Sequence, residues 1–372
     1  MINIIGVGDI MPGGILSGKT DGYLSSELIT VMKSADIRVG TLETAVGNSP
    51  TFYDEKMARD GDVIYVKDKD LSKLKDLDIN IVSLANNHFF DLGEEGAKHT
   101  IQMLDSLGIK HIGAGNNIEE ASRAVIENIH GETVAFIGFC DYEERHVGWC
   151  PYATNDKPGV NPMYESHVES EIRRYKSICD YVVVMPHWGK EHTYTTTLQT
   201  YKAAKAMIKA GADLILGSHP HRVQPVVNFQ RASVAYSLGN FLFPNRLLVP
   251  PRSTYYSETE IDITSLPTTD GYPIVEELTY KKWKPLAMIG MIADAKLSKK
   301  QTKTTYKLTL MHENGCLDIL NNQKIRNILS FRKIIIKYTP YSIFWFIRRC
   351  KYSATYRMKL LKKNLTKIIK KN

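Results

Sequence analysis

The sequence predicts an α/β protein that carries a basic helical tail, and two observations support this prediction. Residues 1–295 alternate short runs of β-branched residues with amphipathic helical stretches, which is the order expected of a sheet whose strands are joined by crossover helices. The residues near the C-terminus mix Lys and Arg with aliphatic and aromatic residues at helical spacing. We therefore expect a folded domain over residues 1–295 and a basic amphipathic extension over residues 296–372.

The elements of the folded domain follow from hydrophobic periodicity. Strands are predicted, in chain order, over Ile2–Val7, Ile37–Leu42, Val63–Val66, Ile79–Leu84, His111–Gly113, Val134–Gly138, Tyr181–Met185 and Leu214–Leu216. Helices are predicted between them over Leu24–Met32, Lys69–Leu77, Glu94–Leu107, Glu165–Cys179 and Leu198–Ala210. In the third of these helices Ala97, Ile101 and Leu104 recur at the spacing of one packed face. This periodicity predicts helices that cover a sheet.

The pattern changes at about residue 225, where strands follow one another without helices between them. These strands are predicted over Pro225–Phe229, Ala232–Tyr236, Glu258–Ile263 and Ile274–Tyr280. Consecutive strands are typical of antiparallel pairing. The sequence therefore predicts a second, more antiparallel sheet in this region.

The net charge of +8 is the sum of an acidic part and a basic part of the chain. No Asp or Glu follows Asp318, and fifteen Lys and Arg lie between Lys324 and Lys371. The other 33 basic residues face 40 acidic ones, so residues 1–322 carry a formal charge of about −7. For residues 324–372 we expect binding to an anionic membrane surface, with packing against the acidic body as the alternative. Nucleic acid is not an expected partner, because the acidic body repels its phosphates.

Cysteine usage and the N-terminus indicate a reducing, cytoplasmic location. The five cysteines are odd in number and show no C-x-x-C spacing, which argues against a disulfide framework and a thiolate zinc site. The N-terminus has neither the basic region nor the long apolar region of a signal peptide. The apolar stretch YSIFWFI at 341–347 is too short to span a bilayer. We expect a cytoplasmic protein, attached at most peripherally to the inner face of the membrane.

Polar side chains follow five of the predicted strands, at the point where each strand ends. Because ligands bind at the carboxyl ends of the strands of an open α/β sheet, we expect these side chains to converge. They are Asp9, Glu43, Asn87 with its neighbour His88, His187, and the pair His219 and His221. Carboxylate, amide and imidazole ligands together suit Mn, Fe or Zn better than Mg or Ca. The sequence therefore predicts a centre for one or two divalent ions, in which Asp9 or Glu43 can bridge a pair about 3.5–4 Å apart.

Six motifs in this order resemble those of the CapA capsule-synthesis proteins. They read GVGDIMPGG, TLETAVG, SLANNHFFDLGEEG, MPHWGKEHT, GSHPHRVQPV and YSLGNFLF, and the resemblance covers roughly residues 2–245. That family includes a poly-γ-glutamate synthesis protein and belongs to the calcineurin-like metallophosphoesterase superfamily. The resemblance implies a metallophosphoesterase-like β-sandwich flanked by helices, with a metal centre at the strand ends.

The resemblance also implies roles for single residues. Asp9 matches the first metal-binding carboxylate, Glu43 stands where the superfamily has a bridging Asp, and Asn87 matches a metal-binding amide. The three histidines His187, His219 and His221 match metal ligands of the later motifs. His88 matches the residue that protonates the leaving group, and Asp91 is expected to support it or to cap the helix that follows.

Two departures from the wider superfamily are visible. The first motif of phosphoesterases has Asp-x-His, whereas this chain has Met11 at the histidine position, and a thioether is a poor ligand for a hard cation. At the second motif Glu43 replaces the usual Asp, which moves the carboxylate by one methylene. Both departures leave open whether two ions bind and whether the chain is a catalyst.

Four further residues are candidates for supporting the centre or binding substrate. Glu191 fits the His-Trp-Gly-x-Glu form typical of CapA-like sequences, and the resemblance implies that it fixes the orientation of an imidazole. Trp188 is assigned to packing, with a carbohydrate-stacking platform as the alternative, and Arg222 follows the histidine pair, where it can meet an anionic substrate. Asn240 matches a family motif, but the sequence gives it no role.

From the resemblance we expect a metal-dependent hydrolase of phosphoester or related bonds in the synthesis of a capsule or cell-surface polymer, poly-γ-glutamate or polysaccharide. The expected partners are a phosphorylated substrate or anionic polymer and a polymer-synthesis complex. The alternative is a non-catalytic, metal-binding accessory subunit of such a complex at the membrane.

Overall fold

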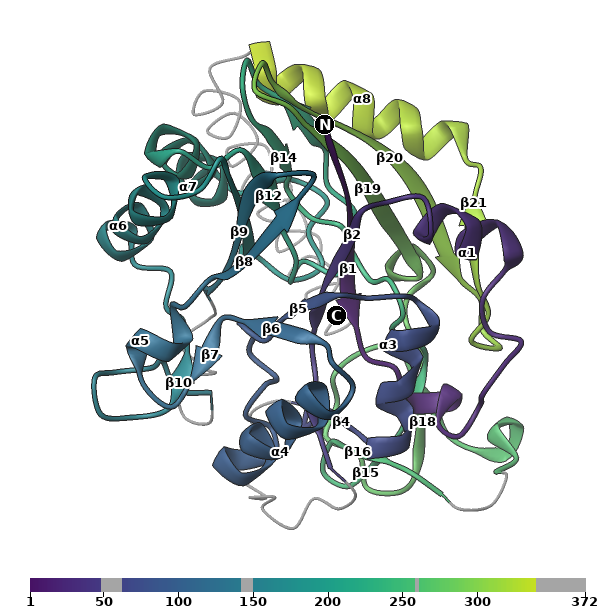
Figure 1. Cartoon of the computed structure of the whole chain (residues 1–372). Coiled ribbons are helices and arrows are strands. Elements are labelled where there is room, and N and C mark those ends of the chain that lie inside the picture. The colour runs from purple at the N-terminus through teal and green to yellow at the C-terminus, as the bar shows by residue number, and fades with distance from the viewer. Residues whose placement is uncertain (48–61, 142–149, 258–260, 339–372) are drawn as a thin grey trace, which may run out of the picture.

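Two large β-sheets, packed face to face, form the centre of the molecule (Figure 1). A computed structural model describes residues 1–47, 62–141, 150–257 and 261–338. The first sheet has seven strands in the order β21 (Leu317–Leu320), β20 (Thr302–Met311), β19 (Ile289–Leu297), β1 (Ile2–Ile10), β2 (Ile37–Leu42), β5 (Ile81–Ser83) and β6 (Lys110–Ile112). The second has six, in the order β13 (Val226–Asn228), β14 (Ser233–Ala235), β12 (Leu214–Leu216), β11 (Tyr181–His187), β9 (Glu132–Cys140) and β8 (Val125–Ile129).

Both sheets have a parallel centre. In the first sheet β1, β2, β5 and β6 run parallel, while β19 joins β1 in antiparallel fashion. In the second sheet β9, β11, β12 and β14 run parallel, and the edge strands β8 and β13 are antiparallel. The carboxyl ends of the parallel strands therefore lie along one edge of each sheet.

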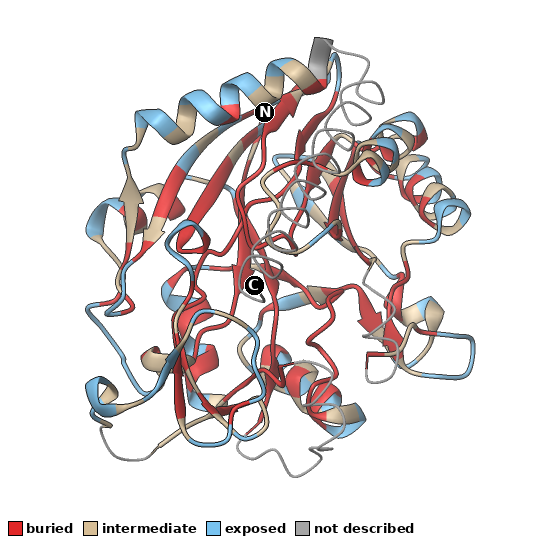
Figure 2. Cartoon of the chain, turned by 180° about the vertical axis from the view of Figure 1, so that it is seen from behind, coloured by how far each residue is buried: buried red, intermediate tan, exposed pale blue. Residues whose placement is uncertain are grey.

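Alternation of side chains builds the core between the sheets. Along β1, Ile2 and Ile4 face the second sheet, whereas Ile5 faces the outer layer. Phe136 of β9 and Val183 of β11 meet them from the opposite side in the same buried cluster. Since each such side chain stabilises the fold by about 1.5–3 kcal/mol when fully buried, the sandwich rests on this layer. Figure 2 shows the strands of both sheets largely buried.

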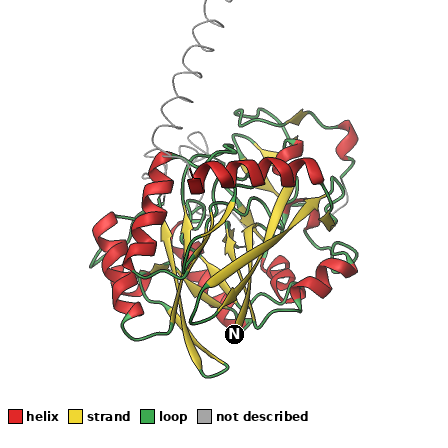
Figure 3. Ribbon diagram, turned by 90° about the horizontal axis from the view of Figure 1, so that it is seen from above, coloured by secondary structure: helices red, strands yellow, loops and turns green. Residues whose placement is uncertain are grey.

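Helices cover the outer face of each sheet (Figure 3). The first sheet is covered by α1 (Ser26–Met32), α3 (Lys73–Asp76) and α4 (Gly93–Ser106), and the second by α6 (Glu165–Lys176) and α7 (Leu198–Ala210). The local sequence sets the ends of these helices: Thr197 caps α7 by accepting from the Thr200 N–H, and Gly211 ends it at φ 124°. The predicted face of α4 is confirmed, because Ala97 and Leu104 are buried against the sheet.

Smaller elements complete the fold. A four-stranded sheet has the order β16 (Ser253–Tyr255), β15 (Arg246–Val249), β18 (Thr279–Lys281) and β17 (Thr268–Thr269). Two-stranded pairs join β3 (Ala45–Val46) to β4 (Tyr65–Val66) and β7 (Ala114–Gly115) to β10 (Gly159–Val160). The short helix α5 covers Ile118–Ala121, and 3₁₀ turns cover Gly14–Leu16, Asp68–Ser72, Ile263–Ser265 and Pro285–Ala287.

The last described element, α8 (Gln323–Tyr338), packs on the sandwich with one face only. Leu329 joins the core between the sheets and Ile336 joins the layer outside the second sheet. The opposite face leaves Ile328, Phe331 and Ile334 exposed by 43, 64 and 55%. Among the described residues no helix is both long and apolar enough to cross a membrane.

The predicted α/β sandwich flanked by helices is confirmed, and most predicted elements lie within a few residues of their observed bounds. The predicted helix Lys69–Leu77 is a 3₁₀ turn followed by the short helix α3. The separate antiparallel sheet expected from residue 225 is only partly right, because β13 and β14 extend the second sheet.

Other predictions fail in the last third of the chain. The predicted strand Glu258–Ile263 falls partly outside the described residues, and Ile263 begins a 3₁₀ turn. Of the predicted strand Ile274–Tyr280, only Thr279 and Tyr280 are in a strand.

The boundary expected after residue 295 falls inside β19, which ends at Leu297. Strands β20 and β21 continue the same sheet as far as Leu320. Residues 296–320 therefore belong to the folded body, and only α8 represents the basic extension among the described residues. Residues 339–372 of that extension lie outside them.

Candidate metal centre

The candidate centre lies where the parallel strands of the two sheets end. Asp9 is the penultimate residue of β1, Glu43 follows β2, and His187 is the last residue of β11. Gly8 allows the backbone near Asn240 to approach β1, because a Cβ at position 8 would stand 1.8 Å from the Gly239 carbonyl oxygen. Asp9 pairs with Asn240 through this approach, so segments far apart in sequence reach one site.

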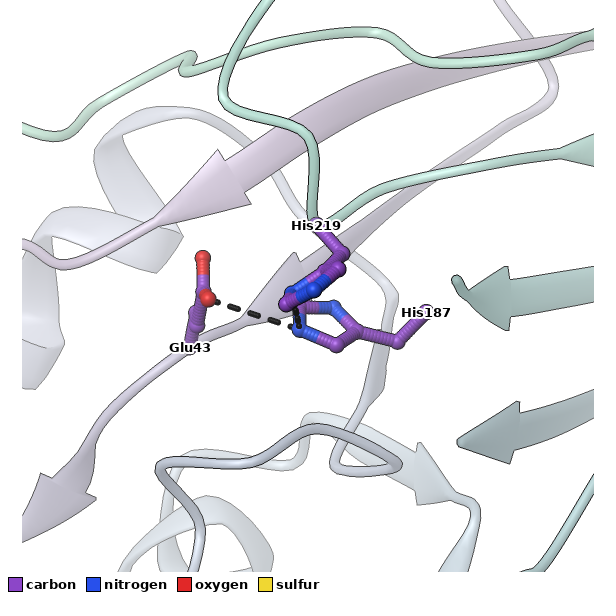
Figure 4. Close-up of side chains that lie close together, drawn as sticks. All are labelled: Glu43, His187 and His219. Carbon is purple, nitrogen blue, oxygen red and sulfur yellow. Dashed lines mark hydrogen bonds and ion pairs between the residues drawn. The ribbon is translucent and has the colours of Figure 1, made fainter. Parts of the chain in front are cut away.

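Four donor atoms converge in the first half of the centre. His187 Nε2 lies 2.7 Å from Asn87 Oδ1, 3.0 Å from His219 Nδ1 and 3.4 Å from Glu43 Oε1. Figure 4 shows Glu43, His187 and His219 turned toward one another. Ligand atoms bound at about 2.1 Å from one ion stand about 3.0–3.4 Å apart in octahedral or tetrahedral geometry. The observed separations are close to that range.

Glu43 also belongs to a second group of candidate ligands. It forms one group with His187 and His219 and another with Asp9 and His221. His221 Nε2 lies 3.6 Å from Glu43 Oε1, and His221 Nδ1 lies 3.5 Å from Asp9 Oδ2. Among the described residues, Glu43 is thus the carboxylate shared by both groups.

The environment of the two carboxylates, Asp9 and Glu43, is better explained by a bound cation than by the protein alone. Asp9 and Glu43 are completely buried, and Asp9 Oδ1 and both oxygens of Glu43 have no hydrogen-bond partner in the described part of the chain. Burial raises the pKa of Asp9 to about 8, and burial together with the neighbouring Asp9 and Glu191 raises the pKa of Glu43 well above its usual value. A divalent ion would relieve this unfavourable burial of charge.

Neighbouring side chains orient the imidazoles. His221 Nδ1 donates to Asn240 Oδ1 at 2.8 Å, while the Asn240 amide donates to the Ala287 carbonyl at 3.1 Å. Burial lowers the pKa of His221 well below its usual value, so the ring is neutral and Nε2 is left to accept an ion. Asn240, for which no role was predicted, holds this imidazole in place.

A second orienting chain was missed by sequence reasoning. His187 Nδ1 lies 3.0 Å from Ser218 Oγ, which accepts from Thr41 Oγ1 at 3.1 Å. Ser218 also lies close enough to the Asp9 carboxyl to lower its pKa, against the larger effect of burial. The only sequence signal was that Ser218 directly precedes His219 in the histidine motif.

The loop that carries the histidine pair has an unusual backbone. His219 and His221 adopt φ values of 90° and 50°, in the region that side chains rarely occupy. Local strain of this kind costs about 1–3 kcal/mol for each residue and is common at functional sites. Gly217 precedes the loop, and a Cβ there would stand 2.4 Å from the Tyr236 carbonyl oxygen.

His88 and Asp91 form a pair beside the centre. His88 Nδ1 lies 2.7 Å from Asp91 Oδ2, and the same oxygen accepts from the Ile64 N–H at 2.6 Å. Asp91 is buried, whereas the side chain of His88 remains 10% exposed. Asp91 therefore supports the imidazole. Asn86 stabilises the turn, since it donates to the Leu42 carbonyl and accepts from the His88 N–H.

The remaining candidates lie in different settings. Trp188 is fully buried and donates from Nε1 to the Tyr236 carbonyl at 2.9 Å, so a substrate-stacking role is wrong. Arg222 is buried and donates to Tyr194 and to the His221 carbonyl, which makes it a support of the histidine loop. Glu191 lies 4.0 Å from His192 Nε2 and close enough to Glu43 to affect its pKa. Met11 is buried in the hydrophobic layer outside the first sheet.

Comparisons with known proteins agree with this arrangement. Residues 3–245 match the family described as "Bacterial capsule synthesis protein PGA_cap". The chain is 31% identical over 248 residues to "Capsule biosynthesis protein CapA" of Bacillus anthracis, covering 64% of this chain and 58% of that protein. It is 30% identical over 243 residues to "PGA biosynthesis protein CapA" of Bacillus subtilis, covering 64% of this chain and 62% of that one.

The chain thus spans about three fifths of the length of these two relatives, 58 and 62%. Among solved structures, a calcineurin-like phosphoesterase from Bacillus subtilis is similar at a TM-score of 0.43 and 13% identity, covering 90% of this chain and 97% of that one. The family match extends over the residues that carry all the candidate metal ligands. The chain belongs to the PGA_cap family of bacterial capsule synthesis proteins.

Proposed function

We propose that this protein is a metal-dependent hydrolase of phosphoester or related bonds that acts in the synthesis of a capsule or cell-surface polymer. One observation carries the proposal: Glu43 is shared by two groups of buried imidazole and carboxylate donors at the carboxyl ends of the strands. This donor set suits Mn, Fe or Zn, in one or two ions. Asp9, Glu43, Asn87, His187, His219 and His221 would hold them.

The bound ions would supply Lewis-acid chemistry, by lowering the pKa of water and neutralising a phosphoryl group. The chain itself supplies the rest. Asn240 and Ser218 fix two of the imidazoles, so the donors do not have to reorganise when substrate arrives. His88, held through Nδ1 by Asp91, directs its other ring nitrogen away from that carboxylate and can deliver a proton to the leaving group.

The biological role follows from the family. The two Bacillus relatives are described as proteins of capsule and PGA biosynthesis. We assign this chain to the same kind of process, with a phosphorylated intermediate or an anionic polymer, poly-γ-glutamate or polysaccharide, as its substrate. A polymer-synthesis complex would be its partner.

We place the protein in the cytoplasm, at the inner face of the membrane. The support is α8, whose outer face exposes Ile328, Phe331 and Ile334 in a segment without acidic residues. Apolar side chains among Lys and Arg are typical of helices that lie in the interface of anionic lipid.

A second candidate function is that of a non-catalytic accessory subunit that binds metal. Met11 favours it, because this residue stands where phosphoesterases have a histidine ligand and its side chain is buried among apolar residues instead. One of the two ion positions would then be incomplete, which suits binding or structure better than hydrolysis.

Metal analysis combined with two variants distinguishes the candidates. For a hydrolase, His221→Ala is expected to lose the ion held by its own group of ligands, while His88→Ala keeps metal and loses about 10²–10⁴-fold in turnover of a bis-phosphodiester or a monoester with added Mn²⁺. His99→Ala is the matched control, because His99 pairs with Asp68 on the surface. Metal binding without cleavage of either ester would favour the accessory subunit, and absence of any bound transition metal would refute both.

A further inference from the structure

Two buried cations share one carboxylate near the candidate metal centre. Arg246 Nη2 and Lys281 Nζ both contact Asp62 Oδ2, the latter at 2.8 Å. The side chains of all three residues are at most 3% exposed. Since one carboxylate neutralises one cation, the triad by itself carries one net positive charge in the protein interior, which is costly unless a nearby anion balances it.

Trp283 lies next to both Arg246 of the triad and His221 of the metal centre. The Arg246 guanidinium lies 5.7 Å from the Trp283 ring centroid, and that ring lies 5.2 Å from the His221 ring. Phe243 makes a second link, because the Arg246 guanidinium lies 5.9 Å from the Phe243 ring centroid and that ring lies 5.7 Å from the His221 ring. Arg246 therefore lies beside the second group of candidate ligands.

Two of the donors in this region are unsatisfied. Arg246 Nε and Trp283 Nε1 have no hydrogen-bond partner among the described residues, although both side chains are more than nine-tenths buried. Buried donors of this kind are rare in native proteins and call for an acceptor. The Lys281 ammonium, which contacts the same Asp62 oxygen as Arg246, adds a charged donor next to Arg246.

The same region borders the solvent. Lys281 Nζ lies 3.4 Å from the Tyr272 ring centroid, and Tyr272 stacks on His192 with their rings 5.4 Å apart. Tyr272 is 39% exposed. A substrate can approach along these rings, with its reacting group at the metal ligands and a second group at the triad.

We propose that Arg246, Lys281 and Trp283 form a subsite for a second oxyanion of the substrate, a phosphate or a carboxylate, next to the metal centre. A guanidinium edge and an ammonium are suited to either group. The inference rests on the proposed function of the same centre. The family match ends at residue 245, and all three residues lie beyond it: Arg246 begins β15, Lys281 ends β18 and Trp283 follows β18. Figure 1 shows these strands at the opposite end of the molecule from the N-terminus where β1 begins.

Lys281 is the member to test, because its removal leaves a neutral pair of Asp62 and Arg246. Burial lowers the pKa of Lys281 to about 8, against the opposing effect of Asp62, so its charge is unfavourable in the folded protein. The charged and titratable groups that face this ammonium are Asp62, Arg246, Glu191, Tyr272 and His192. Lys281→Met is therefore expected to keep or raise the melting temperature.

The experiment is calorimetric titration of the full chain with inorganic phosphate and, separately, with succinate, with and without Mn²⁺ and at constant ionic strength. Lys281→Met is expected to weaken binding of the preferred anion about tenfold or more. Lys282→Met, the neighbouring lysine whose partner is the exposed Glu313, should bind as the wild type does. The anion that loses affinity identifies the group recognised.

Unchanged anion affinity in Lys281→Met would overturn the proposal, and so would a wild type that binds neither anion. A large fall in melting temperature with unchanged affinity would show that Lys281 only supports the fold. The proposed hydrolase can fail separately. In that case elemental analysis finds no metal, or no ester is cleaved, while anion binding that depends on Lys281 persists.

Discussion

Replacement of Glu43 by Gln tests whether one carboxylate serves two ions. Glu43 is the residue common to the group with His187 and His219 and the group with Asp9 and His221. The substitution keeps the shape of the side chain and removes its charge. We expect it to weaken both ion positions, whereas His187→Ala and His221→Ala should each weaken mainly one.

The size of the effect follows from the energy of a protein metal site. A structural zinc site with four ligands contributes about 10–16 kcal/mol, so one ligand accounts for about 3 kcal/mol, or roughly 100-fold in affinity. Glu43→Gln should therefore lower the affinity for each of two ions by about that factor. Each histidine variant should do so for one ion and leave the other within a few fold.

In the metal-free protein, Glu43→Gln should not be destabilising, although the same substitution weakens metal binding. Burial raises the pKa of Glu43, so at neutral pH the carboxyl is ionised more easily in the unfolded chain than in the folded one. This difference in pKa lowers the free energy of unfolding as the pH rises above the pKa that Glu43 has in the unfolded chain. Gln carries no such penalty, and the metal-free variant is expected to melt at the same temperature as the wild type or higher.

The assay is elemental analysis after dialysis against a fixed concentration of free Mn²⁺, together with thermal melts of the metal-free proteins. Glu95→Gln is the control, because Glu95 lies on the surface of α4 and pairs with Lys98. If Glu43→Gln retained as much metal as His187→Ala, or if its metal-free form melted well below the wild type, Glu43 would be a structural residue and not the shared ligand.

Three further outcomes are expected. Phosphate binding should weaken as the pH rises through about 8, because Lys281 loses its proton there. Lys281→Met should lack this pH dependence. The same pH profile in both proteins would contradict the assignment. Gly8→Ala should lower the free energy of unfolding by about 3 kcal/mol in urea titrations, because its Cβ would overlap the Gly239 carbonyl, and an unchanged midpoint would show that the two backbones can separate. Phe331→Ser should weaken sedimentation with phosphatidylserine vesicles about tenfold, and equal binding by the wild type to phosphatidylcholine vesicles would show that charge does not contribute.

The candidate ligands could be located from the sequence because a local signal and a topological rule coincide. Asp9, Glu43 and His187 each stand at the end of a β-branched run, and parallel strands bring such ends to one edge. The roles of Asn240 and Ser218 could not be derived in this way. These roles depend on which imidazole nitrogen Asn240 and Ser218 face. The tertiary contact between β1 and the chain near Gly239 determines this, and the local sequence does not.

The strands after residue 289 were missed for a different reason. In β20 the buried Thr302 and Thr304 alternate with the exposed Lys303, so one face of the strand packs on the body and the other is charged. Such a strand contains few large apolar residues, and its lysines resemble those of the tail that follows. The alternation of buried and exposed residues was present in the sequence, but the lysine content of the strand made it resemble the basic tail.

The Asp62 triad was also beyond the reach of the sequence. Arg246 and Lys281 find their carboxylate 184 and 219 residues away, and they lie outside every motif. A lysine in a short strand and an arginine after a family motif are ordinary residues in isolation. Only their common burial against one acid reveals the surplus charge.

The pairing of β1 with β19 has a consequence for how the chain folds as it is synthesised. Ile2 in the first strand has Leu297 as its partner, so one side of β1 stays unpaired until nearly three hundred residues have been made. At about 5–20 residues per second, this leaves an open strand edge for on the order of 10–60 s. An open edge can pair with other chains. A fragment ending at residue 245, where the family match ends, would keep that edge permanently, and we expect it to aggregate where the longer chain closes its own sheet.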